Sequence, residues 1–238
     1  MKKTSLLYLA FLYFGNASFA QQALTPNVLQ TLRESYTNNS ANKAIRNAVN
    51  ANSIKKLTAN RDHRTTDTWF SHKVKSSGIT DQKQSGRCWL FTGTNVIRAQ
   101  VMAHTGMKDF HFSHAYTFFY DQLEKSNLFL QGIIDTRKKA IDDKMVEWLF
   151  RNPLSDGGQF TGISDLVEKY GLVPKEAMPE TYNSENTNEF SALLKRKLRE
   201  DGILLREAAD KGASEKELEK QKTDMLKTVY RMLVFAYG

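Results

Sequence analysis

The sequence predicts that these 238 residues are mainly helical. Two observations predict this class. Apolar residues recur every three or four positions over several long segments, which is typical of helices that bury one face. Runs in which apolar and polar residues alternate, which would predict strands, are almost absent. We therefore expect a helical core with few strands.

Size and composition are those of a soluble globular protein. The chain can form one large domain or two small ones, and its 40% hydrophobic and 25% charged residues are ordinary values. No internal repeat is visible. We expect three segments: a signal peptide over 1–20, a helical arm over 21–70, and the main domain over 71–238. The apolar end at 235–238 favours a main domain truncated at its C-terminus.

The first twenty residues are typical of a secretory signal. Lys2 and Lys3 precede a short apolar core over 6–14, and small residues at Ser18 and Ala20 predict cleavage before Gln21. The apolar core is short for a membrane span, so we expect no stable membrane anchor. An N-terminal amphipathic helix of the folded protein is the alternative. Export by a signal peptide predicts a periplasmic or secreted protein.

Capping residues and turn signals give the order of the helices. Thr25 and Pro26 begin the first, and Ser40 is expected to cap the second. Ser113 is expected to cap a long helix, and Ser214 with Glu217 matches a capping box. The predicted helices cover 26–35, 41–52, 88–104, 113–133, 142–150 and 161–170, followed by two C-terminal helices that join near Gly212.

Charge and cysteine count restrict the function. The formal net charge is +8, and it falls to +6 if residues 1–20 are removed. Lysines and arginines alternate with acidic residues along the predicted helices, as in 189–227, which favours a solvated surface over nucleic-acid binding. The single cysteine, Cys88, excludes an intrachain disulfide. A lone thiol in an oxidising compartment is a liability, so its presence favours a chemical role.

The segment from Gln82 to Trp89 predicts a nucleophilic thiol. Cys88 is expected in the first turn of a helix, where the helix dipole favours the thiolate that attacks carbonyl carbons. Gly86 lets the backbone approach a substrate. The backbone N–H of Cys88 and the Gln82 amide are expected to stabilise an oxyanion, and Trp89 to exclude water. Arg87 is expected to face solvent. The alternative is a cysteine that only packs as a small hydrophobe.

The segment 82–89, with Phe91 and Asn95, resembles the bleomycin hydrolase / aminopeptidase C group of papain-like cysteine peptidases. The similarity runs from about residue 25 to the end, and the segments 112–116, 152–159, 167–175 and 178–182 carry it further. The resemblance implies an α+β, papain-like fold, here mainly its helical N-terminal part, with most of the β-rich part missing from this chain. It also implies an aminopeptidase that acts on peptides without a metal or organic cofactor. It implies Cys88 as the nucleophile, Gln82 as the oxyanion-hole residue, and backbone binding of substrate by Gly157 and Gly158. It also implies a hexameric homo-oligomer for a full-length form.

The chain departs from this family at its histidines. Papain spacing places the base histidine roughly 130–150 residues after the cysteine. The five histidines here all precede residue 115, namely His63, His72, His104, His111 and His114. His111 and His114 are possible substitutes, although a structural role beside a helix cap is favoured. No Cys/His spacing predicts a metal site. The acidic pair Asp142 and Asp143 fits the start of a helix.

Three functions therefore remain open from sequence. The first is a cysteine aminopeptidase that uses a Cys88 thioester and lacks its base histidine and orienting asparagine in this chain. The second is a truncated, inactive relative that binds peptides or partners. The third, a nucleic-acid-binding module, is the least favoured. The coding sequence that follows residue 238 discriminates between the first two, because the enzyme requires a histidine and an asparagine there.

Overall fold

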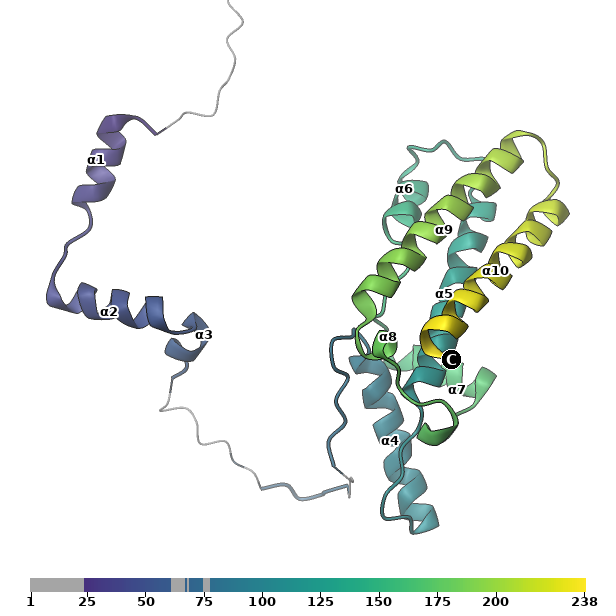
Figure 1. The fold of residues 1–238 in the computed structure, drawn as a ribbon, viewed down its shortest axis with the longest axis horizontal. Coiled ribbons are helices and arrows are strands. Elements are labelled where there is room, and N and C mark those ends of the chain that lie inside the picture. Colours follow the sequence, from purple (N-terminus) through teal and green to yellow (C-terminus); the bar gives the residue numbers. More distant parts are fainter. Residues whose placement is uncertain (1–23, 61–66, 68, 75–77) are drawn as a thin grey trace, which may run out of the picture. The chain divides into compact units, whose positions relative to one another are not determined.

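The computed structural model describes residues 24–60, 67, 69–74 and 78–238 (Figure 1). The predicted signal peptide lies outside the described residues. The chain separates into two units, one ending at Phe70 and the other covering Ser71–Gly238. Each unit is described by itself below.

The first unit contains three helices: α1 (Pro26–Glu34), α2 (Ser40–Ala51) and α3 (Ile54–Leu57). The Thr25 side chain caps α1 as predicted, accepting the N–H of Val28 at 3.3 Å. The prediction for α2 is wrong by one residue, because Asn39 is the cap and its side chain accepts the N–H of Asn42 at 2.8 Å. None of the three helices has a buried residue.

The second unit contains seven α-helices and one 3₁₀ helix in its described residues. They are α4 (Cys88–Thr105), α5 (His114–Asp135), α6 (Lys144–Arg151), α7 (Phe160–Tyr170), η1 (Lys175–Ala177), α8 (Tyr182–Glu185), α9 (Thr187–Asp210) and α10 (Glu215–Tyr237). The described residues form no strand, only two isolated bridges, Gln84 with Asn186 and Phe112 with Pro174. The prediction of a mainly helical chain is confirmed. The short helices η1 and α8 were not expected from the sequence.

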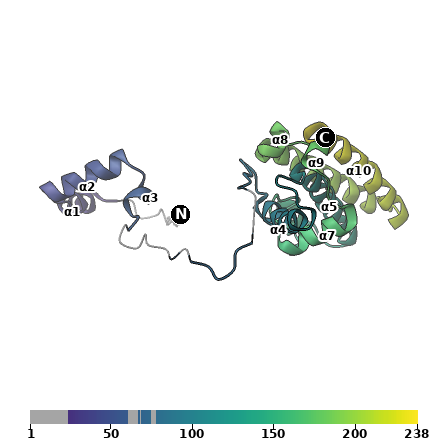
Figure 2. The same ribbon diagram turned by 90° about the horizontal axis from the view of Figure 1, so that it is seen from below.

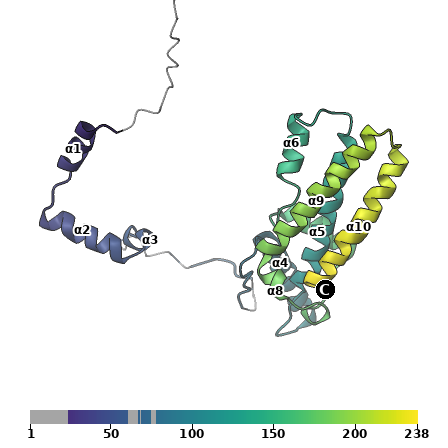
Figure 3. The ribbon, with the colours of Figure 1, turned by 45° about the horizontal axis from the view of Figure 1, so that its top comes forward.

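Helix α5 is the centre of the second unit. It packs most extensively against α10, and also against α9, α4, α6 and α7 (Figure 1, Figure 3). Apolar side chains from these helices form one continuous core, which includes Leu90, Phe118, Leu130, Ile133, Leu194, Leu198, Val229 and Leu233. Burial of these side chains, at about 25 cal/mol per Å² of apolar area, holds the bundle together.

The two long C-terminal helices form an antiparallel hairpin (Figure 3). They join at Gly212, whose φ of 89° lies in the left-handed region that favours glycine. The predicted capping box is present, since the Ser214 hydroxyl accepts the N–H of Glu217 while the Glu217 carboxylate accepts the N–H of Ser214. Both the joint and the cap are confirmed.

Helices α4 and α7 lie against each other at one end of the bundle (Figure 2). Gly93 allows this close approach, because a Cβ there would lie only 2.6 Å from Cγ2 of Ile163. Helix α7 ends at Gly171, which has φ 74° and is the predicted C-terminal cap. The start of α4 and the loop before α7 are thereby brought together.

Candidate active site

Cys88 is the first residue of α4, as predicted. Its thiol is free and exposed, whereas Trp89 and Leu90, which follow it, are buried. The helix is therefore anchored by the residues after Cys88, and the thiol stays accessible at the positive end of an 18-residue helix. This placement rules out the alternative of a cysteine that only fills the core.

The loop that precedes Cys88 is closed by its own hydrogen bonds. The Gln82 amide donates to the carbonyl of Ser85 at 2.7 Å, and the Ser85 hydroxyl donates to the carbonyl of Gln82 at 2.6 Å. Lys83 adopts a left-handed φ of 54° at the turn. Gln84 also fixes the loop to the segment before α9, donating its N–H to the carbonyl of Glu185 at 2.9 Å. Gln82 is thus held in a defined position upstream of Cys88.

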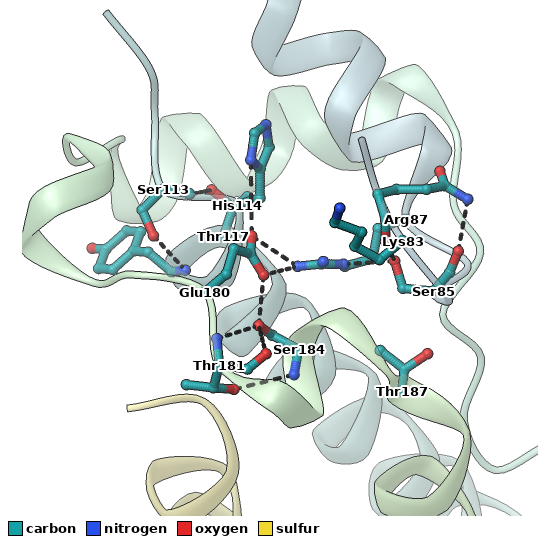
Figure 4. A network of polar contacts seen from close by, with 12 residues as sticks. Lys83, Ser85, Arg87, Ser113, His114, Thr117, Glu180, Thr181, Ser184 and Thr187 are labelled. Atoms are coloured by element: carbon teal, nitrogen blue, oxygen red, sulfur yellow. Dashed lines mark hydrogen bonds and ion pairs between the residues drawn. The ribbon is translucent and has the colours of Figure 1, made fainter. Parts of the chain in front are cut away.

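Arg87 does not face solvent, so that prediction is wrong. Its side chain is fully buried, and its Nη1 atom lies 2.9 and 3.2 Å from the two carboxylate oxygens of Glu180 (Figure 4). Its Nε atom donates to the Ser85 hydroxyl at 2.9 Å. The guanidinium also lies over the ring of Phe91, 5.1 Å from its centroid. A carboxylate partner and aromatic faces make burial of this charge possible.

Glu180 joins Arg87 to two further elements (Figure 4). The Ser184 hydroxyl, in α8, donates to the same carboxylate. His114, the first residue of α5, approaches it to 3.9 Å. Because burial and the nearby positive charge of Arg87 lower the pKa of His114 to about 3, the imidazole is neutral at pH 7 and this approach is not an ion pair. The ring instead stacks on Phe91, with 3.7 Å between centroids.

Trp89 lies directly against the predicted glycine pair. Its Nε1 atom donates to the carbonyl of Asp156 at 2.8 Å. A Cβ added to Gly158 would lie 2.6 Å from the indole ring, so only glycine fits this contact. Lys125 fixes the same loop from α5, donating to the carbonyls of Ser155 and Gly157 at 2.9 and 2.7 Å. The structure therefore brings Cys88, Trp89 and the glycine pair to one place.

Asp156 is a residue that sequence reasoning missed. Its carboxylate accepts the hydroxyls of Thr187 and Ser191, both in α9, and the N–H of Gly86 at 3.5 Å. In the segment 152–159 only Gly157 and Gly158 were given a role from sequence. The signal that was present is an acidic residue placed immediately before the glycine pair, but its partners lie 31, 35 and 70 residues away in sequence.

The histidines that the structure describes do not supply a base beside Cys88. His114 is buried and, with a pKa near 3, is too weak a base to accept a thiol proton. His111 lies 2.8 Å from Nη1 of Arg98 and 3.3 Å from Asp109. His104 lies at the opposite end of α4, about 24 Å along the helix axis at 1.5 Å per residue. His72 is exposed beside Ser71, and His63 lies outside the described residues.

Other features of the described residues are separate from this site. A groove of about 600 Å³ between α5, α7 and α10 is lined by residues such as Leu123, Tyr170 and Leu226 and includes neither Cys88 nor the glycine pair. No cluster of three metal-ligating side chains occurs among the residues with described positions. Within the same part of the chain, no helix is long and apolar enough to cross a bilayer.

The sequence and the structure are both similar to known peptidases. Residues 23–238 match the family described as "Peptidase C1-like family". The chain is 39% identical over 193 residues to aminopeptidase C of Lactobacillus delbrueckii subsp. lactis, covering 81% of this chain and 43% of that protein. It is 38% identical over 173 residues to human bleomycin hydrolase, covering 71% of this chain and 38% of that protein.

The crystal structure of PepW from Lactobacillus rhamnosis HN001 superposes with a TM-score of 0.82 at 38% identity, covering 92% of this chain and 49% of PepW. The chain thus spans less than half the length of each of these three proteins.

Proposed function

Because the chain belongs to the Peptidase C1-like family, we propose that it is the nucleophile-bearing part of a cysteine aminopeptidase that releases N-terminal residues from peptides. The observation that carries this proposal is the position of Cys88. Its exposed thiol begins a helix whose next residue, Trp89, is packed against a glycine pair. The names of the relatives, aminopeptidase C and bleomycin hydrolase, support the reaction class.

The proposed reaction proceeds through a thioester. The Cys88 thiolate attacks the carbonyl carbon of the first peptide bond, and the carbonyl oxygen becomes an oxyanion. The Cys88 N–H and the Gln82 amide stabilise that oxyanion. One of the two amide protons of Gln82 is donated to Ser85, so the second is left for the substrate. Collapse of the intermediate breaks the peptide bond, and water then hydrolyses the thioester.

The glycine pair supplies the binding surface. Gly157 and Gly158 are exposed and have no side chains to hinder a peptide that approaches their backbone. Their loop is held by Trp89 and Lys125, so the backbone groups are fixed in place before a substrate arrives. Main-chain hydrogen bonds of this kind bind a peptide as an added strand, independently of its side chains.

The departing amine requires a proton, and the thiol requires a base. None of the described histidines suits this role, as shown above for His111 and His114. We propose that a histidine and its orienting asparagine come from polypeptide beyond residues 1–238. The relatives are more than twice as long as the segment of them that this chain matches, which leaves room for such residues. An export signal over 1–20, and a homo-oligomer for the longer form, are parts of the same proposal.

The lack of a suitable base among the described histidines also favours a second function. A chain with Cys88 and the glycine pair, but without a base, binds peptides and does not turn them over. The discriminating experiment measures the release of free amino acids from a short peptide by the 238-residue chain and by the product of the coding sequence with its continuation. Release by the longer product that is abolished by Cys88→Ala supports the peptidase. If the continuation encodes neither histidine nor asparagine, the binding function is favoured.

A further inference from the structure

Asp156 contacts the start of α9, the loop before Cys88 and the start of α4. Its carboxylate accepts the hydroxyls of Thr187 and Ser191 from the start of α9, the latter at 2.9 Å. Its Oδ2 atom also lies 3.5 Å from the N–H of Gly86 in the loop before Cys88. Its own carbonyl accepts the indole N–H of Trp89 at 2.8 Å. The glycine pair follows it directly in the chain.

The contact between Asp156 and the loop before Cys88 is tight. A Cβ at Gly86 would lie 2.7 Å from Cβ of Asp156, so the backbone of one segment rests on the side chain of the other. The same loop is bonded to the segment that leads into α9, because Thr187 donates its N–H to the carbonyl of Gln84 at 3.3 Å. Thr187 therefore bonds to both sides of the site, through its backbone to one loop and through its hydroxyl to Asp156.

We propose that Asp156 is a positioning residue that sets the separation between the Cys88 thiol and the peptide-binding backbone of Gly157 and Gly158. The start of α9 serves as the fixed reference. The two hydroxyl bonds of Asp156 hold the glycine loop to it, and the bond from the Thr187 N–H to the Gln84 carbonyl holds the loop before Cys88. The inference rests on the proposed function, because it assumes that a peptide bound at the glycine pair presents its carbonyl to Cys88. It adds a residue, and a helix, to which no role in the reaction had been assigned.

The carboxylate suits this role because it accepts several hydrogen bonds and donates none. Its three donors come from two different segments, two hydroxyls from α9 and one N–H from the loop before Cys88, so the carboxylate joins these segments. Misplacement of reacting groups by about 1 Å costs on the order of 10²-fold in rate. Small changes in the position of the glycine pair therefore change reaction with a peptide much more than reaction with a small reagent.

The test compares two alkylating reagents on the 238-residue chain. Iodoacetamide reports only the reactivity of the Cys88 thiol, whereas the chloromethyl ketone of leucine, whose ketone stands in for the first peptide carbonyl, must also align along the glycine pair. In each case the thiolate displaces halide and forms a thioether. The measured quantity is the ratio of the second-order rate constants, ketone over iodoacetamide, divided by the same ratio for glutathione. Thermal unfolding curves establish that each variant is folded.

The variants form matched pairs. Asp156→Ala and Thr187→Val remove the two ends of one hydrogen bond, and Thr187→Ser restores the hydroxyl. Asp142→Asn removes an exposed acid of the same unit and controls for charge. For the wild type we expect a normalised ratio greater than one. We expect this ratio to fall about tenfold in Asp156→Ala and Thr187→Val, and to keep the wild-type value in Thr187→Ser and Asp142→Asn. If Asp156→Ala does not fold, the Thr187 pair decides.

Two results overturn the inference in different ways. The positioning role is refuted if Asp156→Ala or Thr187→Val keeps the wild-type preference for the ketone. It is also refuted if Thr187→Ser loses this preference as much as Thr187→Val does. Both results leave the proposed function standing. A wild type with no preference for the ketone refutes peptide binding at the glycine pair, and the inference falls with it.

Discussion

The indole N–H of Trp89 donates to the carbonyl oxygen of Asp156 at 2.8 Å. The residue that follows the only cysteine is thus bonded to the residue that precedes the glycine pair. This bond joins the start of α4 to the loop before α7, although the two segments are 67 residues apart in sequence. The candidate nucleophile and the candidate substrate-binding backbone are therefore parts of one rigid arrangement.

Replacement of Gly158 by alanine is expected to disrupt this arrangement. The new Cβ would lie 2.6 Å from the Trp89 ring, so the indole or the loop must move. Overpacking of this kind costs about 1–3 kcal/mol of unfolding free energy. Gly157→Ala is the matched control, because its Cβ meets only the Ser155 hydroxyl at 3.4 Å. Urea unfolding of the two variants checks the difference, and equal stabilities would show that Trp89 is not tightly packed there.

Loss of the Arg87 guanidinium is expected to destabilise the second unit strongly. Arg87→Met leaves the carboxylate of Glu180 without its charged partner, and breaking a buried pair in this way costs about 3–5 kcal/mol. Lys83→Met is the control, since its pair with Asp81 is exposed and screened by solvent, and contributes little to stability. Adding Glu180→Gln to Arg87→Met should recover part of the loss. Equal effects of the two single variants on chemical unfolding would contradict the buried pair.

His114 is expected to make the chain less stable in mild acid. Its pKa falls from 6.5 to about 3 on folding, so the unfolded chain binds more protons between these values. The stability that the neutral ring provides is complete above pH 6.5 and is lost as the pH falls toward 3. The slope is about 1.4 kcal/mol per pH unit within this window.

His114→Phe should remove that part of the pH dependence. Phenylalanine keeps the stack on Phe91, and the buried Nε2 atom of His114 has no hydrogen-bond partner to lose. His104→Gln, at an exposed position, is the control. Unfolding free energies measured from pH 7 to pH 4 check the prediction. If His114→Phe loses stability as steeply as the wild type, another group is responsible.

The sequence predicted local features well and distant partners poorly. The start of α4 at Cys88 and the capping box at Ser214 follow from residues within four positions of each other, where helix dipole and capping rules apply. The burial of Arg87 depends on Glu180, which lies 93 residues away. A charged residue beside an exposed cysteine is expected to face water unless its partner is known, and periodicity does not identify that partner.

The candidate site shows the same difference between local features, which the sequence predicts, and distant partners, which it does not. The glycine pair and Trp89 are visible in the sequence as separate motifs, but their contact requires α4 and α7 to pack closely at Gly93. Asp156 was missed because its two hydroxyl partners belong to a helix that begins 31 residues later. Its role is defined only by the packing of the long helices.

The most direct test of the account is acylation of Cys88 by an activated ester. With the p-nitrophenyl ester of leucine, the thiolate attacks the carbonyl, nitrophenolate leaves without needing a proton, and a leucyl thioester forms. We predict that mass spectrometry of the quenched 238-residue chain finds one added leucyl group on Cys88, and none in Cys88→Ala. Gln82→Ala should slow acylation on the order of 10²-fold, as loss of an oxyanion donor does.

Gln84→Ala, an exposed side chain on the same loop, should not slow the acylation. Absence of the leucyl group from Cys88, or equal rates of acylation in the wild type and Gln82→Ala, would contradict the claim that this chain carries the nucleophile and oxyanion hole of a cysteine aminopeptidase.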